Sequence, residues 1–535
     1  DGVSYGNKVH YQHHGIWFAR HGYVCLTIDT LQLGEIEGIH HGTYNHDMWW
    51  WNSRGYSSAS VEAWNSIRAL DYLETLDFVD KNRFGVTGRS GGGAYSWWIS
   101  VLDERIKVSA PVAGITSLKN HVYAGFQNSG RLAHGVVEGH CDSMFHVNTY
   151  RWDFDHIAAL VAPRPLMILN TDDDRIFPLD GVTDVFNGVR RIYDLHGQRN
   201  KLGLTIVPGG HSDTQPLQVP AFNWFNRHLK GEEGPITVAA VKLFEPEQLK
   251  VFNELPADSI NADIQEAFTQ LADDKSKPSQ KTVELLRAKT FRGWPAKENS
   301  LNAKRAFSTE YEGVVFEAID FDSQEHIRLR AYIAYRKGLE KPSRVDVEVL
   351  NEEYWNKYLK LGRPAFADVW GEELKLAKIK ADAPVTDKEQ QAIEKRMAGV
   401  RKGDVVFVAF MPRGFGLSAM TQDERHITHS RRRFMLLGQT LAGMQVWDVR
   451  RCVRLVQDLG YVCPVTLWGY DTTSSQVALA ALFEQIATVH VKGYPENDKM
   501  QPDYLNISRI ATPSQILELT RQRSQVNVLD QKKKR

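Results

Sequence analysis

The chain has 535 residues, of which 42% are hydrophobic and 24% charged, and this composition is typical of a soluble globular protein with two or three domains. Its 65 basic and 65 acidic residues give a formal net charge of zero, which argues against nucleic acid or an anionic membrane as the main partner. No apolar run approaches the length of a membrane span. The four cysteines lack metal-site spacing and are too few for a disulfide framework, so they predict no metal and leave the compartment open, periplasmic or secreted included.

The first 51 residues predict a helix, a buried strand and an aromatic loop. We expect the helix over residues 7–21 and the strand over residues 22–29, where apolar and β-branched residues lie between turn signals. The loop contains a histidine cluster at positions 40, 41 and 46, without a second set of ligands at metal-site spacing. Its tryptophans, Trp49, Trp50 and Trp51, either form a platform for a substrate or pack as a lid.

Strands alternate with helices from residue 57 to residue 230, and this alternation predicts a doubly wound, mostly parallel α/β sheet. We expect strands at residues 84–90, 106–112, 165–170 and 202–208, and helices from Ser57–Ser60, after Ser90, at residues 182–193 and at residues 219–230. Residues 115–158, which include His140, are interpreted as an insertion near the site.

The stretch Gly88-Arg89-Ser90-Gly91-Gly92 joins an apolar strand to a helical pattern. A serine between glycines at a strand-to-helix turn is the arrangement of a nucleophile elbow, in which small neighbours allow close backbone packing. The motif by itself is a weak signal, but its position between a strand and a helix predicts that Ser90 is a nucleophile.

Two further polar residues follow later strands, and the carboxyl ends of parallel strands are where functional groups gather. Asp174 precedes Arg-Ile-Phe-Pro after one strand, and His211 follows the last strand. The order Ser90, Asp174, His211 is that of the α/β-hydrolases. Asp172 and Asp173 compete with Asp174 for the acid role, and Asp213 is interpreted as a turn or cap residue.

On these residues, the first 230 positions resemble the α/β-hydrolase superfamily, and within it the bacterial acetyl xylan esterase and dienelactone hydrolase-like group. The resemblance implies a Ser90 nucleophile, a His211 base and an Asp174 carboxylate that orients the imidazole. It implies an oxyanion donor at Gly91 and no cofactor. Arg89, His140 and the three tryptophans are the candidates for substrate contact.

The second oxyanion donor of this family comes from a loop after an early strand. Nothing before residue 7 corresponds to the starting strands or to that loop. We therefore expect an N-terminally incomplete catalytic domain over residues 1–230, and the alternative is that the strands come from elsewhere.

The second half predicts a helical connector at residues 231–310, a second α/β-hydrolase-like domain at 311–525 and a basic tail at 526–535. Its segment Val465–Asp471 parallels Phe84–Ser90, which indicates an internal repeat. Asp471 then takes the place of Ser90, and no equivalents of the strands before Asp174 and His211 are expected. A degenerate, non-catalytic domain is favoured over an Asp471 nucleophile.

The function predicted from these features is a serine esterase that forms an acyl-enzyme. An acylated polysaccharide or small ester is the expected substrate, with acetyl the first choice by analogy alone. A prolyl oligopeptidase-type peptidase remains open, and so does a glucuronoyl-type methylesterase, although Gly91 replaces the arginine usual there. A non-catalytic carbohydrate-binding or scaffold protein is the alternative from another class.

Overall fold

The computed structural model describes residues 5–129, 137, 140–420 and 423–529. It divides into two compact units, each formed by several stretches of chain. The first unit contains Asp1–Trp51, Tyr56–Gln270 and Thr428–Leu437, and the second contains Asn52–Gly55, Leu271–Ile427 and Gly438–Arg535. Among the described residues, none of the helices has the length and apolar character needed to span a bilayer.

The first unit has a four-stranded sheet in which neighbours along the chain are also neighbours in space. Its strands are β1 (Phe84–Arg89), β2 (Ile106–Val112), β3 (Leu166–Thr171) and β4 (Leu202–Val207). Each pair is parallel. This pairing confirms the prediction of a parallel α/β sheet for these strands. Helices form each of the crossover connections that parallel strands require.

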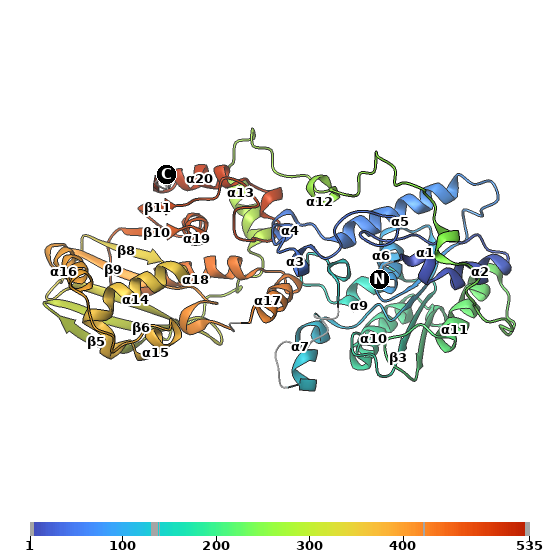
Figure 1. Cartoon of the computed structure of the whole chain (residues 1–535), viewed down its shortest axis with the longest axis horizontal. Helices are drawn as coiled ribbons and strands as arrows, with labels where there is room; N and C mark the ends of the chain where they lie inside the picture. Colours follow the sequence, from blue (N-terminus) through green and yellow to red (C-terminus); the bar gives the residue numbers. More distant parts are fainter. Residues whose placement is uncertain (1–4, 130–136, 138–139, 421–422, 530–535) are drawn as a thin grey trace. The chain divides into compact units, whose positions relative to one another are not determined.

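Helices cover this sheet on opposite faces, and α10 and α11 flank β3 in Figure 1. Trp17 of α2 stacks on Phe222 of α11 with ring centroids 3.8 Å apart, which holds α2 against α11. The helices of this unit are α1 (Asn7–His10), α2 (Gln12–Arg20), α3 (Gly42–Asn45), α4 (Trp50–Arg54), α5 (Ser58–Glu74), α6 (Gly91–Leu102), α7 (Leu118–Ser129), α9 (Phe154–Ala158), α10 (Leu179–Leu195), α11 (Gln215–Phe225) and α12 (Ile264–Ala267).

The strand expected at residues 22–29 is not formed, and this prediction is wrong for the described structure. The segment has no regular secondary structure and pairs with no strand of the described sheet. Val24 and Leu26 keep 47% and 43% of their surface exposed. An apolar, β-branched pattern fits a pleated, buried surface, and it forms a strand only where partner strands supply hydrogen bonds.

The first unit extends beyond the boundary expected at residue 230, because residues 231–270 return across it. Trp17 Nε1 donates to the carbonyl of Val238 at 2.9 Å, and Gln12 Nε2 donates to that of Phe244 at 2.8 Å. This stretch is largely irregular rather than helical. Residues 428–437 also belong here, since Arg432 donates to the carbonyl of His140 at 2.6 Å.

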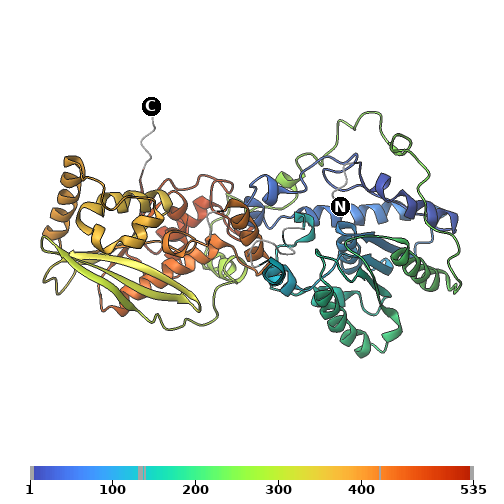
Figure 2. The same ribbon diagram turned by 60° about the horizontal axis from the view of Figure 1, so that its bottom comes forward.

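The second unit has an eight-stranded sheet in the order β12-β11-β10-β8-β9-β7-β6-β5. Strands β5 to β7 form the antiparallel meander drawn in yellow in Figure 2, and β8 to β12 are parallel to one another. The strands are β5 (Lys304–Tyr311), β6 (Val314–Gln324), β7 (Ile327–Arg336), β8 (Arg344–Val349), β9 (Val405–Phe410), β10 (Val465–Tyr470), β11 (Thr488–Lys492) and β12 (Gln525–Leu529).

Strand β12 corrects two expectations for the end of the chain. It pairs in parallel with β11, as β3 pairs with β2 in the first unit, so a counterpart of the strand before Asp174 is present. The basic tail expected from residue 526 begins as this strand, and residues 530–535 lie outside the described residues.

The helices of the second unit are α13 (Gln280–Leu285), α14 (Glu352–Phe366), α15 (Gly371–Leu376), α16 (Asp387–Lys402), α18 (Leu441–Asp458), α19 (Thr472–Ala480) and α20 (Pro513–Arg521), and α17 (Glu424–Leu436) lies partly in each unit.

The turn from β1 into α6 depends on contact between glycine backbones. A Cβ placed on Gly93 would lie 2.4 Å from the carbonyl oxygen of Val112 and 2.9 Å from Cα of Gly114. Both distances are too short for a methyl group at Gly93, so α6 lies directly against the end of β2. Gly92, one residue earlier, has nothing within 4 Å of its would-be Cβ.

We predict opposite effects for alanine at these two positions. Gly93→Ala should lower the free energy of unfolding by about 2 kcal/mol or more, because the methyl group meets backbone atoms that cannot move aside. Gly92→Ala should leave it unchanged or raise it by up to about 1 kcal/mol, since alanine favours the helix. Urea unfolding of the two variants measures the difference, and equal stability would contradict the packing described.

A carboxyl group is buried in α5 beside the aromatic loop. Glu62 is 1% exposed, and its Oε1 accepts a hydrogen bond from the Leu31 N–H at 2.6 Å. Burial raises the pKa of Glu62 to about 7, against the weaker lowering effect of that hydrogen bond. The folded state therefore keeps the proton over a pH range in which the unfolded chain has released it.

We predict that Glu62 makes the protein less stable as pH rises from 4.5 towards 7. In that range the folded state binds the extra proton, so the free energy of unfolding falls with pH, by about 3 kcal/mol for a pKa raised from 4.5 to about 7. Glu62→Gln keeps an acceptor for Leu31 and removes the titration. Urea unfolding of both chains at pH 4.5 and pH 8 isolates this contribution, because the other titrating groups are common to both. The stability of the parent relative to the variant should fall by about 3 kcal/mol between the two pH values, and an unchanged difference would contradict the raised pKa of Glu62.

Candidate functional site

Ser90 lies at the end of β1 in a backbone conformation that L-residues rarely adopt. Its φ is 60° and its ψ −119°, and its N–H donates to the carbonyl of Val112 at 3.0 Å. Such a conformation costs on the order of 1–3 kcal/mol and persists where surrounding structure enforces it, often at a functional site. The turn places Ser90 directly before the first residue of α6.

Asp174 follows β3 and His211 follows β4, which pairs with β3. The two side chains form a hydrogen bond. His211 Nδ1 lies 2.8 Å from Asp174 Oδ2. The Asp174 side chain is fully buried, and its other oxygen accepts the N–H groups of Ile176 and Phe177 at 2.9 and 3.0 Å. Both carboxylate oxygens are therefore engaged, and the imidazole is held from its Nδ1 side.

The surroundings of Asp174 favour its ionised form. Burial alone would raise the pKa of this carboxyl, but the hydrogen bond and charge of His211, with the N–H groups of Phe177 and Ile176, outweigh burial and lower the pKa below its ordinary value. An ionised carboxylate can fix the tautomer of His211 and stabilise the imidazolium that forms when Nε2 takes a proton.

The contact between Ser90 and His211, the predicted nucleophile and base, is not closed in this structure. Among the described residues, the Ser90 hydroxyl makes no hydrogen bond with His211. Catalytic hydrogen bonds are often long before substrate binds, so the geometry remains compatible with proton transfer. Gly91 begins α6, and its backbone N–H lies at a helix N-terminus, where developing negative charge is stabilised.

Arg89, a predicted substrate contact, hydrogen-bonds to neighbouring protein groups. Its Nε donates to Tyr11 Oη at 2.9 Å and its Nη1 to the carbonyl of His211 at 3.4 Å. The side chain thus joins the end of β1 to Tyr11, the residue before α2, and to the loop that carries His211. This arrangement positions the loop.

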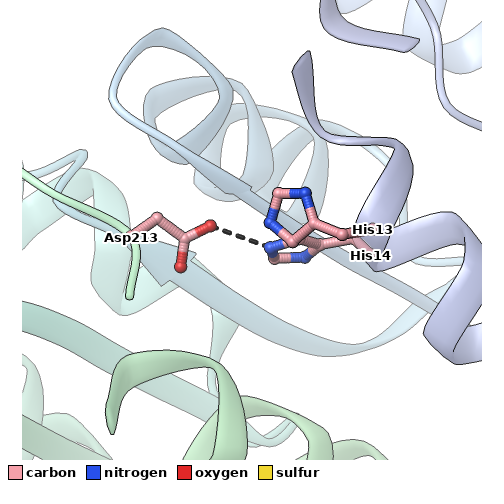
Figure 3. A group of neighbouring side chains, drawn as sticks. All are labelled: His13, His14 and Asp213. Atoms are coloured by element: carbon pink, nitrogen blue, oxygen red, sulfur yellow. Dashed lines mark hydrogen bonds and ion pairs between the residues drawn. The ribbon is translucent and has the colours of Figure 1, made fainter. Parts of the chain in front are cut away.

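A second pair supports the same loop from α2. His14 Nε2 lies 2.8 Å from Asp213 Oδ2, and the ring of His13 packs edge-on against that of His14 (Figure 3). Burial and the neighbouring His14 lower the pKa of His13 to about 4. Asp213 was interpreted as a turn or cap residue, and the sequence carries no signal for its long-range partner.

These three side chains are the one group of metal-ligand type found among the described residues. Zinc holds its ligands at about 2.0–2.2 Å from a common centre and usually takes four in a structural site. Here His14 and Asp213 bind each other directly, and His13 Nε2 lies 3.3 Å from Gln218 Nε2. The group acts as a hydrogen-bonded support, and His40, His41 and His46 are not brought together with it.

The tryptophans of the loop are mostly buried. Trp51 is 1% exposed and packs with Leu31 and Tyr56, and Trp49 lies under the guanidinium of Arg431, 3.7 Å from the ring centroid. Buried rings cannot serve as a platform for a sugar. The packed-lid alternative fits Trp49 and Trp51, and Trp50 is half-buried.

His140 lies behind the Asp174 loop. It is buried, its ring stacks on Phe177 at 4.7 Å, and its Nε2 lies 3.0 Å from the carbonyl of Ile176. Burial lowers the pKa of His140 well below its ordinary value, so the ring is neutral. The structure thus gives this predicted substrate contact a place in the support of Asp174, with Arg432 on its carbonyl.

Comparison with known proteins finds similarity to carbohydrate esterases over part of the first unit. The family of fungal glucuronyl esterases matches residues 40–197. The protein named "Putative hydrolase YtaP" of Bacillus subtilis (strain 168) is 27% identical over 210 residues, which cover 39% of this chain and 66% of that protein. The resemblance to α/β-hydrolase esterases predicted from the sequence is confirmed.

Two further relatives are named as esterases of glucuronoyl groups. The 4-O-methyl-glucuronoyl methylesterase of Phanerochaete carnosa (strain HHB-10118-sp) is 25% identical over 244 residues, covering 41% of this chain and 58% of that protein. The solved glucuronoyl esterase of carbohydrate esterase family 15 from Caldicellulosiruptor kristjansonii is 23% identical, with a TM-score of 0.29, covering 38% of this chain and 58% of that one. The chain thus spans less than two thirds of the length of the curated relatives described.

We predict that Asp174, and neither of its acidic neighbours, controls the reactivity of Ser90. Asp174→Asn should slow labelling of Ser90 by a fluorophosphonate by about 10³-fold to 10⁴-fold, because the amide no longer fixes the reactive tautomer of His211. Asp173→Asn is the matched control, since Asp173 is exposed, and its labelling rate should stay within a few-fold of the parent. Equal rates for both variants would contradict the role of Asp174.

Proposed function

We propose that the first unit is a serine carboxylic-ester hydrolase that acts on an esterified carbohydrate. The observation that carries the proposal is the Asp174–His211 hydrogen bond of 2.8 Å at the strand ends next to the constrained turn of Ser90. The similarity to glucuronyl esterases over residues 40–197 supports the carbohydrate substrate.

In the proposed reaction, Ser90 Oγ attacks the ester carbonyl carbon while His211 Nε2 takes the hydroxyl proton. The tetrahedral oxyanion lies against the Gly91 N–H, and Asp174 stabilises the imidazolium. When the intermediate collapses, the ester C–O bond breaks and His211 returns the proton to the leaving alcohol. Water activated by His211 then attacks the acyl-enzyme and releases the carboxylic acid and free Ser90.

Two carbohydrate esters compete as the substrate. We favour an acetyl ester, because Gly91 follows the nucleophile where glucuronoyl-type enzymes usually have an arginine. A methyl ester of a glucuronoyl group is the second candidate, and the names of two relatives favour it. The substrates differ in which side of the ester bond carries the sugar, so their products distinguish them.

We predict that the chain releases acetate from acetylated xylan and that Ser90→Ala loses this activity by at least about 10³-fold. The panel should also contain a methyl glucuronate ester, a short p-nitrophenyl ester and a proline-containing peptide. Methanol release alone would favour the glucuronoyl ester, and peptide cleavage would favour a peptidase. Absence of both turnover and Ser90 labelling would instead support a binding or scaffold protein.

A further inference from the structure

The second unit encloses a cavity between its sheet and two of its helices. Helices α14 and α16 pack against each other and over β6, β7 and β9 (Figure 1), and a cavity of about 180 Å³ lies between these helices and the sheet. Protein interiors have few voids larger than a water molecule, and an empty space in an apolar core costs stability. An apolar cavity of about 150 Å³ is large enough to hold benzene, so this one has room for a single ring.

Aromatic side chains form the inner wall of this cavity. Phe316 of β6 stacks on Phe366 of α14 with ring centroids 4.1 Å apart, and Trp370 meets Phe316 edge-on at 5.5 Å. Gly362 allows Trp370 to reach this wall, because a Cβ at that position would lie 2.4 Å from the indole ring. The ring of Tyr358 lies 5.5 Å from that of Trp370. Aromatic rings pair well in stacked and edge-on arrangements, so the wall suits another planar ring.

Trp370 brings an unused hydrogen-bond donor to the cavity. The residue is 1% exposed, and its Nε1 has no hydrogen-bond partner among the described residues. In the same unit, Trp294 Nε1 donates to the carbonyl of Gly443 at 2.8 Å, and Trp447 Nε1 to that of Ser323 at 2.9 Å. A buried donor without an acceptor costs free energy. An occupant that carries an oxygen atom on its ring would remove this cost.

The mouth of the cavity carries charged side chains that reach solvent. Two cations, Lys357 and Arg396, line the cavity together with one carboxylate, Glu348. Lys357 is exposed, and the other two are half-buried. Arg396 Nη2 donates to Glu348 Oε1 at 3.3 Å, so this carboxylate already has a cationic partner. The lining therefore has an excess of positive charge, which favours an anion over a cation.

Lys357 is paired outside the cavity, in a contact that it can exchange. Its Nζ donates to Glu353 Oε1 at 2.5 Å, and it also interacts electrostatically with Asp471. Both carboxylates lie outside the lining. Exposed ion pairs add little to stability, so Lys357 can turn towards an anion in the mouth. A further cation, Lys492, has its Nζ 5.9 Å from the ring centroid of Tyr354, which lines the cavity.

We propose that this cavity of the second unit binds a single-ring aromatic carboxylate with an oxygen substituent on the ring, such as a hydroxybenzoate. The ring packs among Phe316, Phe366 and Trp370, and its oxygen substituent accepts a hydrogen bond from Trp370 Nε1. The carboxylate lies at the mouth beside Arg396 and Lys357. Binding there makes and breaks no covalent bond, and the site belongs to a different unit from Ser90.

Calorimetric titration of the full chain with 4-hydroxybenzoate tests the proposal. We expect one site with a Kd of about 1 mM or lower. 4-Hydroxybenzylamine keeps the ring and reverses the charge, and cyclohexanecarboxylate keeps the charge without an aromatic ring. Both should bind about tenfold more weakly or worse. Benzoate lacks the acceptor for Trp370 and should bind more weakly than 4-hydroxybenzoate, whereas equal affinity would overturn the assigned pairing with Trp370.

Four variants connect the binding to this cavity. Ala409 of β9 lines it, so Ala409→Leu should fill the space and abolish binding, with urea unfolding as the check that the variant is folded. Arg396→Gln removes a cation of the mouth and should weaken binding by about tenfold. Arg401→Gln is its control on the same helix, since Arg401 pairs with Glu312 at 2.7 Å, and should bind like the parent. Glu348→Gln removes the competing carboxylate and should tighten binding.

An absence of measurable heat with 4-hydroxybenzoate would overturn the site. Tighter binding of the amine than of the acid, together with a loss of binding in Glu348→Gln, would overturn it in favour of a cation site at Glu348. Binding that survives in folded Ala409→Leu and slows fluorophosphonate labelling of Ser90 would place the ligand in the first unit and also overturn the proposal. Equal weakening by Arg396→Gln and Arg401→Gln would contradict the role of the mouth.

Discussion

The close approach of the α6 backbone to the end of β2 is the constraint on which the site depends. Gly93 lies against Val112 and Gly114 with no room for a side chain, and the Ser90 N–H is held by the Val112 carbonyl. These contacts enforce a backbone conformation at Ser90 that the residue would not adopt alone. The serine is consequently fixed at the end of β1, at the same sheet edge as the loops that carry Asp174 and His211.

The second unit contains the same backbone turn with an aspartate in the place of the serine. Asp471 has nearly the same φ and ψ as Ser90, and a Cβ on Gly469 would lie 2.6 Å from the Thr473 carbonyl, as one on Gly88 would from that of Gly92. The turn is thus a property of strand, glycine and helix packing. The reaction proposed for the first unit needs in addition an imidazole, and there His211, which comes from far along the chain, is the candidate.

Support for that imidazole comes from several segments that local sequence patterns do not connect. Asp174 binds one nitrogen of His211, Arg89 binds its carbonyl, and Asp213 ties the same loop to His14 in α2. The buried His140 packs behind the Asp174 loop through Phe177. The contacts of Asp174, Arg89 and Asp213 are hydrogen bonds, whose directionality restricts the loop more than apolar packing alone would.

The sequence by itself determined the elements whose signals are local. The elbow motif, the parallel strands of the first unit and the order Ser90, Asp174, His211 all follow from hydrophobic runs and small residues at fixed offsets. Only the tertiary structure decided the features that depend on contact with distant segments of the chain. Residues 22–29 have a strand pattern but no strand beside them, Trp51 is enclosed by residues of other elements, and Asp213 meets His14 across about 200 positions. A pattern can state that a segment fits a buried, hydrogen-bonded place, and the packing of distant segments decides whether that place exists.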